Sequence, residues 1–280
     1  MLTLAALGSG SGGNAFVATA DREAIIIDLG FSRRELRSRM SRLSIAPEIL
    51  SGALLTHDHD DHVRGCRVFC DELHLPLYAS SGTVRYLRRR GKLPGKVVEF
   101  EPGARFSVGT FSVTAFPVPH DAEDPVGFVI AADGCRIGFA TDLGNVNALV
   151  RRHLADCDAL VLESNYDPDM LRRSDRSLML KRRIAGRDGH LDNSGAAAAL
   201  ADILTPRTKL LLLAHVSREC NDPELVRECT AAQLARLRRS DLPFEVLTQD
   251  APCGPFAFDP DAGKFLRCEE GGAGGREAAI

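Results

Sequence analysis

The sequence of 280 residues contains no long apolar run, and no segment approaches the roughly 18 apolar residues that a membrane-spanning helix needs. Its first residues, MLTLAALGSGSGGN, lack the basic start and the extended apolar middle of a secretory signal peptide. We therefore expect a cytoplasmic protein that makes no contact with a membrane.

Two further features are missing from the composition: paired cysteines and an excess of basic residues. The eight cysteines form no CxxC pair and mostly lie in apolar segments, which suits reduced thiols better than a disulfide framework. The formal net charge is -3, which argues against a wholly basic protein that coats nucleic acid. Local basic patches remain possible, because net charge does not describe them.

What is present is the alternation of an α/β protein. Short apolar runs predict strands at residues 2–7, 15–19, 24–28, 52–55, 111–118, 127–131, 136–140, 159–162, 209–214 and 244–247. Amphipathic segments predict helices at 33–42, 82–92, 146–153, 193–204 and 224–239. Two strand-rich halves that each end in helices would pack as two sheets face to face, although periodicity alone leaves one sheet open. We expect one domain over residues 1–268 and a disordered tail over 269–280.

Five apolar runs each finish with a potential ligand or acid. These endings are the motif HDHDDH at 57–62, then His120, Asp142, Glu163 and His215. Functional sites of α/β proteins collect at the carboxyl ends of strands, so the layout predicts one pocket built from distant parts of the chain.

The motif HDHDDH indicates a metal site. An extended His-x-His places His57 and His59 on one side of the backbone, where both can bind one ion. Asp61 and His62 then belong to a second ion. Three imidazoles and a carboxylate suit Zn²⁺, Mn²⁺ or Fe²⁺, whereas a merely solvated turn would gain nothing from such a mutually repelling set.

Three later residues complete two ligand shells. His120 offers a further imidazole to the first ion, Asp142 a carboxylate between the ions, and His215 the last ligand of the second ion. The alternatives are a loop histidine, a helix cap and a core histidine, respectively.

Glu163 and His190 are not needed as ligands, and we interpret them as an acid–base pair. A carboxylate that accepts a hydrogen bond from an imidazole orients it and raises its pKa, as a general acid for a departing alkoxide requires. Capping or surface roles are the alternative. We expect His74 and His153 to be structural.

The glycine-rich segment GSGSGG formally matches a dinucleotide-binding motif, and Asp28 follows at a suggestive distance. The next residues, AFVATA, predict a strand instead of the helix that would hold a pyrophosphate. We therefore expect a tight hairpin turn and no nucleotide cofactor, with Asn14 or the loop amides at the edge of the pocket.

Two basic stretches occupy residues 85–96 and 171–187. We expect the first stretch to be an ordinary charged surface exposed to solvent. The second lies between Glu163 and His190, and we expect its Lys181, Arg182 and Arg183 to bind phosphates of a substrate.

The chain resembles the metallo-β-lactamase superfamily, and within it the YycJ/WalJ-like exonucleases. The resemblance runs through GSGSGGNAF, THDHDDHVRG, PHDAEDPVGF, TDLGNV, LESNYDPDML, LKRRIAG with GHLDN, and LAHVS, in that order. It implies a four-layer αββα sandwich and agrees with the two ligand shells given above. The pair Glu163 and His190 looks like the proton-donor arrangement of the RNase Z branch. Asp192 departs from the small hydroxyl residue of relatives, and a long β-CASP insertion is absent.

These features together predict a metal-dependent phosphodiester hydrolase, with DNA as the expected substrate and exonuclease action as the expected mode. Two divalent ions would activate a water that Asp61 orients, and His190 would protonate the leaving oxygen. The rivals are a hydrolase of small molecules on the same site, acting on a cyclic phosphodiester, thioester or lactone, and a binding module without activity.

Overall fold

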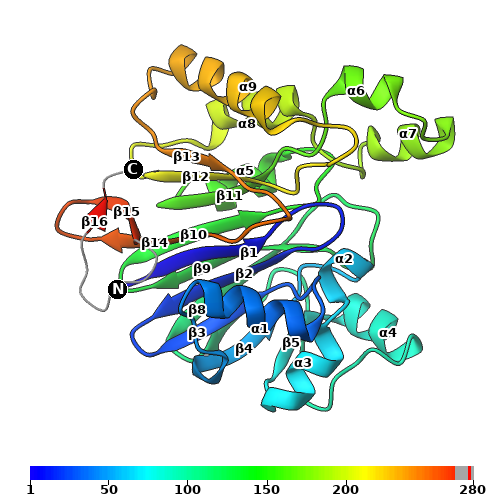
Figure 1. Cartoon of the computed structure of the whole chain (residues 1–280), viewed down its shortest axis with the longest axis vertical. Helices are drawn as coiled ribbons and strands as arrows, with labels where there is room; N and C mark the ends of the chain where they lie inside the picture. The colour runs from blue at the N-terminus through cyan, green and yellow to red at the C-terminus, as the bar shows by residue number, and fades with distance from the viewer. Residues whose placement is uncertain (269–276, 279–280) are drawn as a thin grey trace.

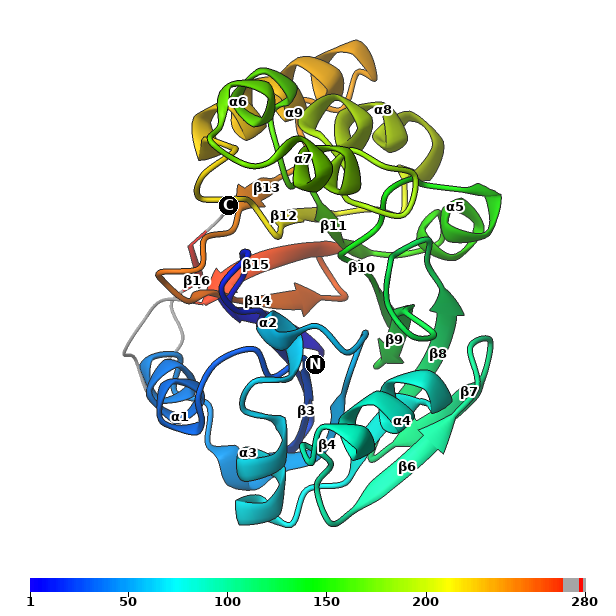
Figure 2. The ribbon, with the colours of Figure 1, turned by 90° about the vertical axis from the view of Figure 1, so that its right-hand side faces the viewer.

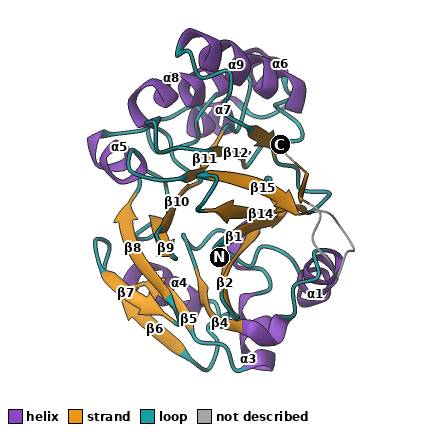
Figure 3. Ribbon diagram, turned by 90° about the vertical axis from the view of Figure 1, so that its left-hand side faces the viewer, coloured by secondary structure: helices purple, strands orange, loops and turns teal. Residues whose placement is uncertain are grey.

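The computed structural model describes residues 1–268 and 277–278. In this part of the chain, two β-sheets lie face to face (Figures 1 and 3). The first has the strand order β16-β15-β14-β1-β2-β3-β4-β5-β6 and the second β13-β12-β11-β10-β9-β8-β7. The first comprises β1 (Thr3–Gly8), β2 (Ala15–Ala20), β3 (Glu23–Ile27), β4 (Leu50–Leu54), β5 (Leu77–Ser80), β6 (Val97–Phe100), β14 (Cys253–Asp259), β15 (Lys264–Cys268) and β16 (Glu277–Ala278). The second comprises β7 (Arg105–Val108), β8 (Phe111–Pro117), β9 (Val126–Ala132), β10 (Cys135–Ala140), β11 (Ala159–Glu163), β12 (Leu210–Ala214) and β13 (Phe244–Val246).

Helices cover the outer face of each sheet. The described helices are α1 (Arg33–Arg42), η1 (Pro47–Ile49), α2 (Asp60–Val63), α3 (Cys66–Leu73), α4 (Ser81–Arg89), α5 (Ala148–Leu154), α6 (Pro168–Arg173), α7 (Leu178–Ile184), α8 (Asn193–Ile203) and α9 (Pro223–Arg236). Side chains from α1, α3 and α4 pack on the first sheet, and side chains from α5, α8 and α9 pack on the second (Figure 1). The layers are therefore helix, sheet, sheet, helix.

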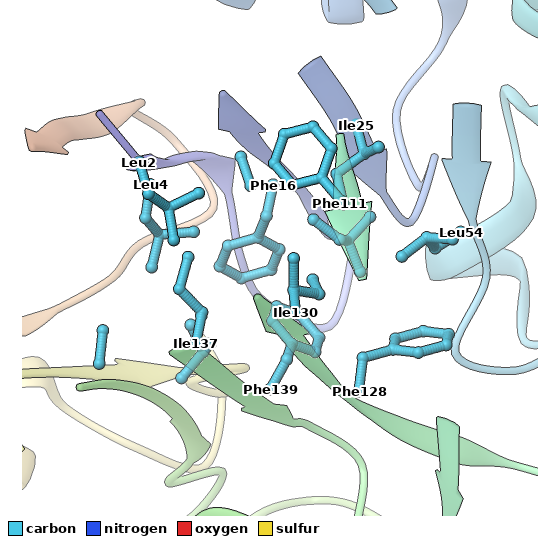
Figure 4. Packing of buried hydrophobic residues seen from close by; sticks show 14 of the residues in the cluster. Leu2, Leu4, Phe16, Ile25, Leu54, Phe111, Phe128, Ile130, Ile137 and Phe139 are labelled. Carbon is cyan, nitrogen blue, oxygen red and sulfur yellow. The ribbon is translucent and has the colours of Figure 1, made fainter. Parts of the chain in front are cut away.

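The central strands are buried on both faces, which explains why they are apolar without alternation. In β3, Ile25 and Ile27 belong to the core between the sheets, while Ile26 belongs to the core under the helices. The inter-sheet core is rich in phenylalanine (Figure 4). The rings of Phe16 and Phe139, one from each sheet, meet edge to face with centroids 4.7 Å apart, which is a favourable aromatic geometry.

Local signals fix where the helices begin. Ser32 and Glu35 form a reciprocal capping box at the start of α1. Asp192 caps α8 by accepting from the amide of Gly195. The amide of Gly195 is thus satisfied, so the departure of Asp192 from a small hydroxyl residue leaves the start of the helix intact.

The structure confirms the predicted αββα layers and excludes the single-sheet alternative. It also corrects the strand list. The strands β6, β7, β14 and β15 were not predicted, because β6 and β7 are four-residue strands with partly exposed side chains and β14 contains Pro255, which reads as a strand breaker. The helices α2, α3, α6 and α7 were also not predicted. The predicted disordered tail falls outside the described residues, except for β16, which pairs with β15.

Among the described residues, no helix has the length and apolar character that crossing a bilayer would require.

Candidate metal centre

The predicted site residues meet at one end of the two sheets. His57, His59, Asp61 and His62 follow β4 in the first sheet, whereas His120, Asp142 and His215 follow β8, β10 and β12 in the second. Since β10, β11 and β12 are parallel neighbours, their carboxyl ends share an edge. Figure 2 looks toward this end, where α2 and α7 are seen.

The first group of imidazoles comes from His57, His59 and His120. The ring centroids of His57 lie 4.6 Å from His59 and 4.9 Å from His120, and the last two are 4.9 Å apart. Burial, followed by the neighbouring imidazole of His62, holds the pKa of His57 well below its usual value. His57 is therefore neutral, which is the form that binds a metal ion.

The second group is made by Asp61, His62 and His215. Oδ2 of Asp61 lies 3.2 Å from Nε2 of His215 and 3.5 Å from Nε2 of His62. Burial would lower the pKa of His215, but the carboxylates around it outweigh burial and raise the pKa to about 10. The carboxylates of Asp61, Asp142 and Glu163 thus make the surroundings of His215 negative, which a divalent cation would compensate.

Asp142 lies between the two groups. Its Oδ2 is 3.2 Å from Nε2 of His62, and its Oδ1 is 3.4 Å from Nδ1 of His215 and 3.8 Å from Nε2 of His120. Burial would raise the pKa of this carboxyl, but His215 and His62 hold it well below its usual value. The backbone at Asp142 has φ 55°, a left-handed conformation that turns its side chain into the cluster at some cost in strain.

Four of the imidazoles share one orientation, in which Nδ1 is held by an oxygen outside the cluster. Nδ1 of His57 lies 3.0 Å from Oγ1 of Thr56, and that of His62 lies 2.8 Å from Oδ2 of Asp28. Nδ1 of His120 and of His215 lie 3.0 Å from the carbonyl of Gly189 and from Oε1 of Glu163, respectively. Each Nε2 is then left for the cluster. Such contacts are what orient metal-binding histidines in proteins.

These residues fit metal ions. Ligand atoms of His57, His59 and His120 lie within 4.8 Å of one another, as do those of Asp61, His62 and His215 and those of His57, His62 and Asp142. Nε2 of His57 is buried and has no hydrogen-bond partner, a costly arrangement unless an ion uses it. Imidazole and carboxylate donors suit zinc, manganese or iron.

The backbone around the second group is closely packed. The amide of Asn14, at the end of the glycine-rich loop, donates to the carbonyl of Asp61, and that of Leu29 donates to the carbonyl of His62. A Cβ on Gly30 would lie 1.7 Å from the carbonyl oxygen of Asp61, so only glycine fits there. The glycine-rich loop is the predicted hairpin connection between β1 and β2, and Nδ2 of Asn14 lies 3.1 Å from Nε2 of His62.

Glu163 and His190 form the predicted pair. Oε1 of Glu163 lies 2.7 Å from Nδ1 of His190, while its Oε2 accepts from the amides of Leu143 and Leu191 at 2.9 and 3.1 Å. Burial would lower the pKa of His190, but Glu163 raises it above its usual value. His190 faces the cluster, since its ring centroid is 5.2 Å from those of His120 and His215.

The cluster opens into a pocket whose rim carries cations. Of the three predicted phosphate-binding residues, Arg183 lines the pocket, and so does Arg176, which was not singled out. Nζ of Lys181 is instead used on the backbone, where it donates to the carbonyls of Arg172 and Ser174 at 2.8 and 2.7 Å. Arg182 is exposed and does not line the pocket.

Sequence reasoning missed several supporting residues. The clearest example is Asp28, which follows an apolar run as the predicted ligands do. From the sequence we considered it only as the acidic residue of a dinucleotide-binding motif, which we rejected. Asn165 donates to the carbonyl of His215 at 2.7 Å, and Asp121 pairs with Arg183. Neither of these carries a local signal. His74 caps α3 and His153 stacks on Phe116.

The four layers with a His/Asp cluster at one end are the architecture of a metallo-hydrolase. Comparisons with known proteins agree. The chain matches the Beta-lactamase superfamily domain over residues 23–215, and it belongs to this superfamily. It is 32% identical over 228 residues to exodeoxyribonuclease YycJ of Bacillus anthracis, with 81% of this chain and 86% of the relative covered. It is also 32% identical over 235 residues to exodeoxyribonuclease WalJ of Streptococcus pneumoniae, with 82% and 87% covered. Among solved structures, the metallo-β-lactamase fold protein YhfI of Bacillus subtilis has a TM-score of 0.67 at 14% identity, covering 90% of this chain and 99% of that one.

Proposed function

We propose that this hydrolase is a DNA exonuclease that cleaves phosphodiester bonds with two divalent metal ions. The observation that carries the proposal is the contact between Glu163 and His190 at the edge of the metal cluster. An oriented imidazole with a raised pKa is needed where the leaving group is a poor alkoxide, as in a nucleic acid. The similarity to two exodeoxyribonucleases supports DNA as the substrate.

The proposed ligand sets follow the geometry of the cluster. His57, His59 and His120 would hold one ion, Asp61, His62 and His215 the other, and Asp142 would contact both. When bound, such a pair lowers the pKa of a water molecule and stabilises negative charge on phosphoryl oxygens.

The remaining roles belong to residues of the chain. Asp61 lines the pocket and would orient the attacking water through its carboxylate. His190 would donate its proton to the leaving oxygen, and Glu163 would hold the imidazole with Nδ1 toward itself. Arg176 and Arg183 would bind neighbouring phosphates at the rim. Lys181 and Arg182 stay predicted substrate contacts that lie outside the pocket lining.

We also propose that residues 1–268 act as one cytoplasmic domain. The shared inter-sheet core supports this, because neither sheet could bury its inner face without the other.

The decisive experiment is digestion of end-labelled DNA and RNA, single-stranded and double-stranded, by protein stripped of metal and then given zinc, manganese or iron. We expect stepwise shortening of DNA after metal is restored. Asp142→Ala is the matched negative control, and it should bind fewer ions than the wild type. Hydrolysis of a thioester, a lactone or a cyclic phosphodiester without digestion of any nucleic acid would overturn the proposal and favour a small-molecule hydrolase.

A further inference from the structure

The helix α7 presents two large apolar side chains to solvent beside the pocket. Leu178 is 64% exposed and Met179 is 82% exposed, and these are the highest values among the large hydrophobic residues that the structure describes. Single exposed apolar residues are ordinary on a protein surface. Two adjacent ones at the start of a short helix, next to a catalytic pocket, need an explanation.

The opposite side of α7 is occupied. Leu180 and Ile184 pack with Leu171 and Cys220 in a small separate core, and Leu180, Arg183 and Ile184 line the pocket. Residues three and four positions apart share a face of a helix, so Leu178, Met179 and Arg182 form the outer face. Met179 also lies four residues before Arg183, which lines the pocket, so the pair borders the rim of the pocket.

The segment that carries the pair is cationic. Residues 168–188, which contain α6 and α7, carry seven lysine and arginine side chains against three carboxylates, although the whole chain has a net charge of -3. Two carboxylates from outside the segment, Glu219 and Asp121, pair with Arg176 and Arg183, and the segment stays positive when both are counted. No ion pair or hydrogen bond occupies the side chains of Arg173 and Arg182 within the described part of the chain. This helical arm lies at the end of the sheets that holds the metal cluster (Figure 2).

The positive charge of this segment distinguishes between two molecules that could cover Leu178 and Met179. A second copy of the chain would bring an equally cationic arm against this one if the contact were symmetric, and the arms would repel. A polyanion is attracted instead. Apolar side chains such as leucine and methionine are used by nucleic-acid-binding proteins as wedges that part neighbouring bases.

We propose that Leu178 and Met179 form a wedge that separates the end of a DNA duplex, so that one strand enters the pocket past Arg176 and Arg183. This inference rests on the proposed function and specifies its substrate as duplex ends. The wedge stacks on the terminal base pair, and the cations hold the backbone on either side. A terminal nucleotide has to leave its partner strand to enter the pocket, and the wedge offsets part of the cost of unstacking.

The test uses the full-length protein with its metals restored and the double variant Leu178→Ser with Met179→Ser. Both side chains are exposed, so the variant should melt at the wild-type temperature. The control is Val68→Ser, which removes a side chain that is 56% exposed. It lies on α3, and α3 is at the opposite end of the view from α6 and α7 (Figure 2). Initial rates are measured on single-stranded DNA, on the blunt duplex of the same sequence, and on that duplex with mismatched terminal pairs.

We expect the double variant to lose about tenfold or more on the blunt duplex, the order set by unstacking one base step. The single strand should be cut at the wild-type rate, and the mismatched ends should restore the rate on the duplex. Equal losses on single and double strands, or no loss on either, would overturn the wedge. So would a change in sedimentation that reveals a lost contact between copies.

The outcomes separate this inference from the proposed function. Wild-type protein that cuts single strands but no duplex would overturn the wedge and leave the exonuclease proposal standing. Wild-type protein that cuts no nucleic acid would overturn both.

Discussion

Glu163 holds two histidines through one oxygen, because its Oε1 lies 2.7 Å from Nδ1 of His190 and 3.0 Å from Nδ1 of His215. The proposed proton donor and a proposed metal ligand are thus oriented by the same carboxylate. Its other oxygen is fixed by two backbone amides, so the carboxylate cannot turn away from either imidazole. A substitution at Glu163 should therefore affect both proton donation by His190 and metal binding by His215. A substitution at another residue of the site should affect one of the two.

Replacing the proposed acid should damage the chemistry and spare the metals. His190→Ala should keep its ions but lose about 10² to 10⁴-fold in kcat on DNA, which is the usual contribution of general acid catalysis. On a nitrophenyl phosphodiester the loss should nearly vanish, because nitrophenolate leaves without a proton. His74→Ala is the control, since that residue caps α3. Loss of metal from the His190 variant would make His190 a ligand instead.

The pH dependence should follow the pKa of His190. The acid acts in its protonated form, so the rate should fall as pH rises through its pKa, which Glu163 holds above the usual 6.5. Glu163→Gln removes that negative charge while an amide can still occupy the same space. The alkaline limb of the pH–rate profile should therefore lie at lower pH in this variant than in the wild type. Measurement of kcat across the pH range checks this. An unmoved limb would show that another group sets it.

Asp28 should control metal affinity without touching the metal. Its Oδ2 lies 2.8 Å from Nδ1 of His62, and its side chain is fully buried. Asp28→Asn should weaken binding about 10- to 100-fold, the usual effect of losing a partner behind a histidine ligand. Competition with a chelator measures this directly. The same affinity as wild type, with a lower melting temperature, would make Asp28 a purely structural residue.

The rim cations should be visible in the salt dependence of DNA binding. Each phosphate contact contributes roughly one to the slope of log K against log salt, so Arg176→Ala with Arg183→Ala should reduce the slope by about two. Lys181→Ala is the matched comparison, because its ammonium is engaged by two backbone carbonyls. It should lower stability and change the slope less than the loss of the two arginines does. The reverse pattern would favour the contacts predicted from sequence at Lys181.

Much of this fold and site could be predicted because the signals are local. Strands buried on both faces are apolar throughout, and the proposed ligands come at their ends, as His215 does after LLLLA. The contact of Lys181 with the carbonyls of Arg172 and Ser174 could not be predicted, since it depends on how α6 and α7 pack. Asp28 was within reach, because it follows AIII and obeys the same strand-end rule as His120 and Asp142. Strand β14 could not be predicted. It contains Pro255, which is typical of a break in a strand, and it pairs with β1, which lies some 250 residues away in the sequence.

The origin of the cluster from both sheets also decides when a newly made chain can become active. A ribosome that has finished the first sheet as far as β6 has supplied His57 to His62, but neither Asp142 nor His215. Even after His215 emerges, β14 has yet to be made, and it is the strand that pairs with the free side of β1. The nascent chain therefore lacks at least one of the proposed ligands until His215 has been added. The two groups of the cluster can therefore meet only after both sheets have been made and have docked on each other.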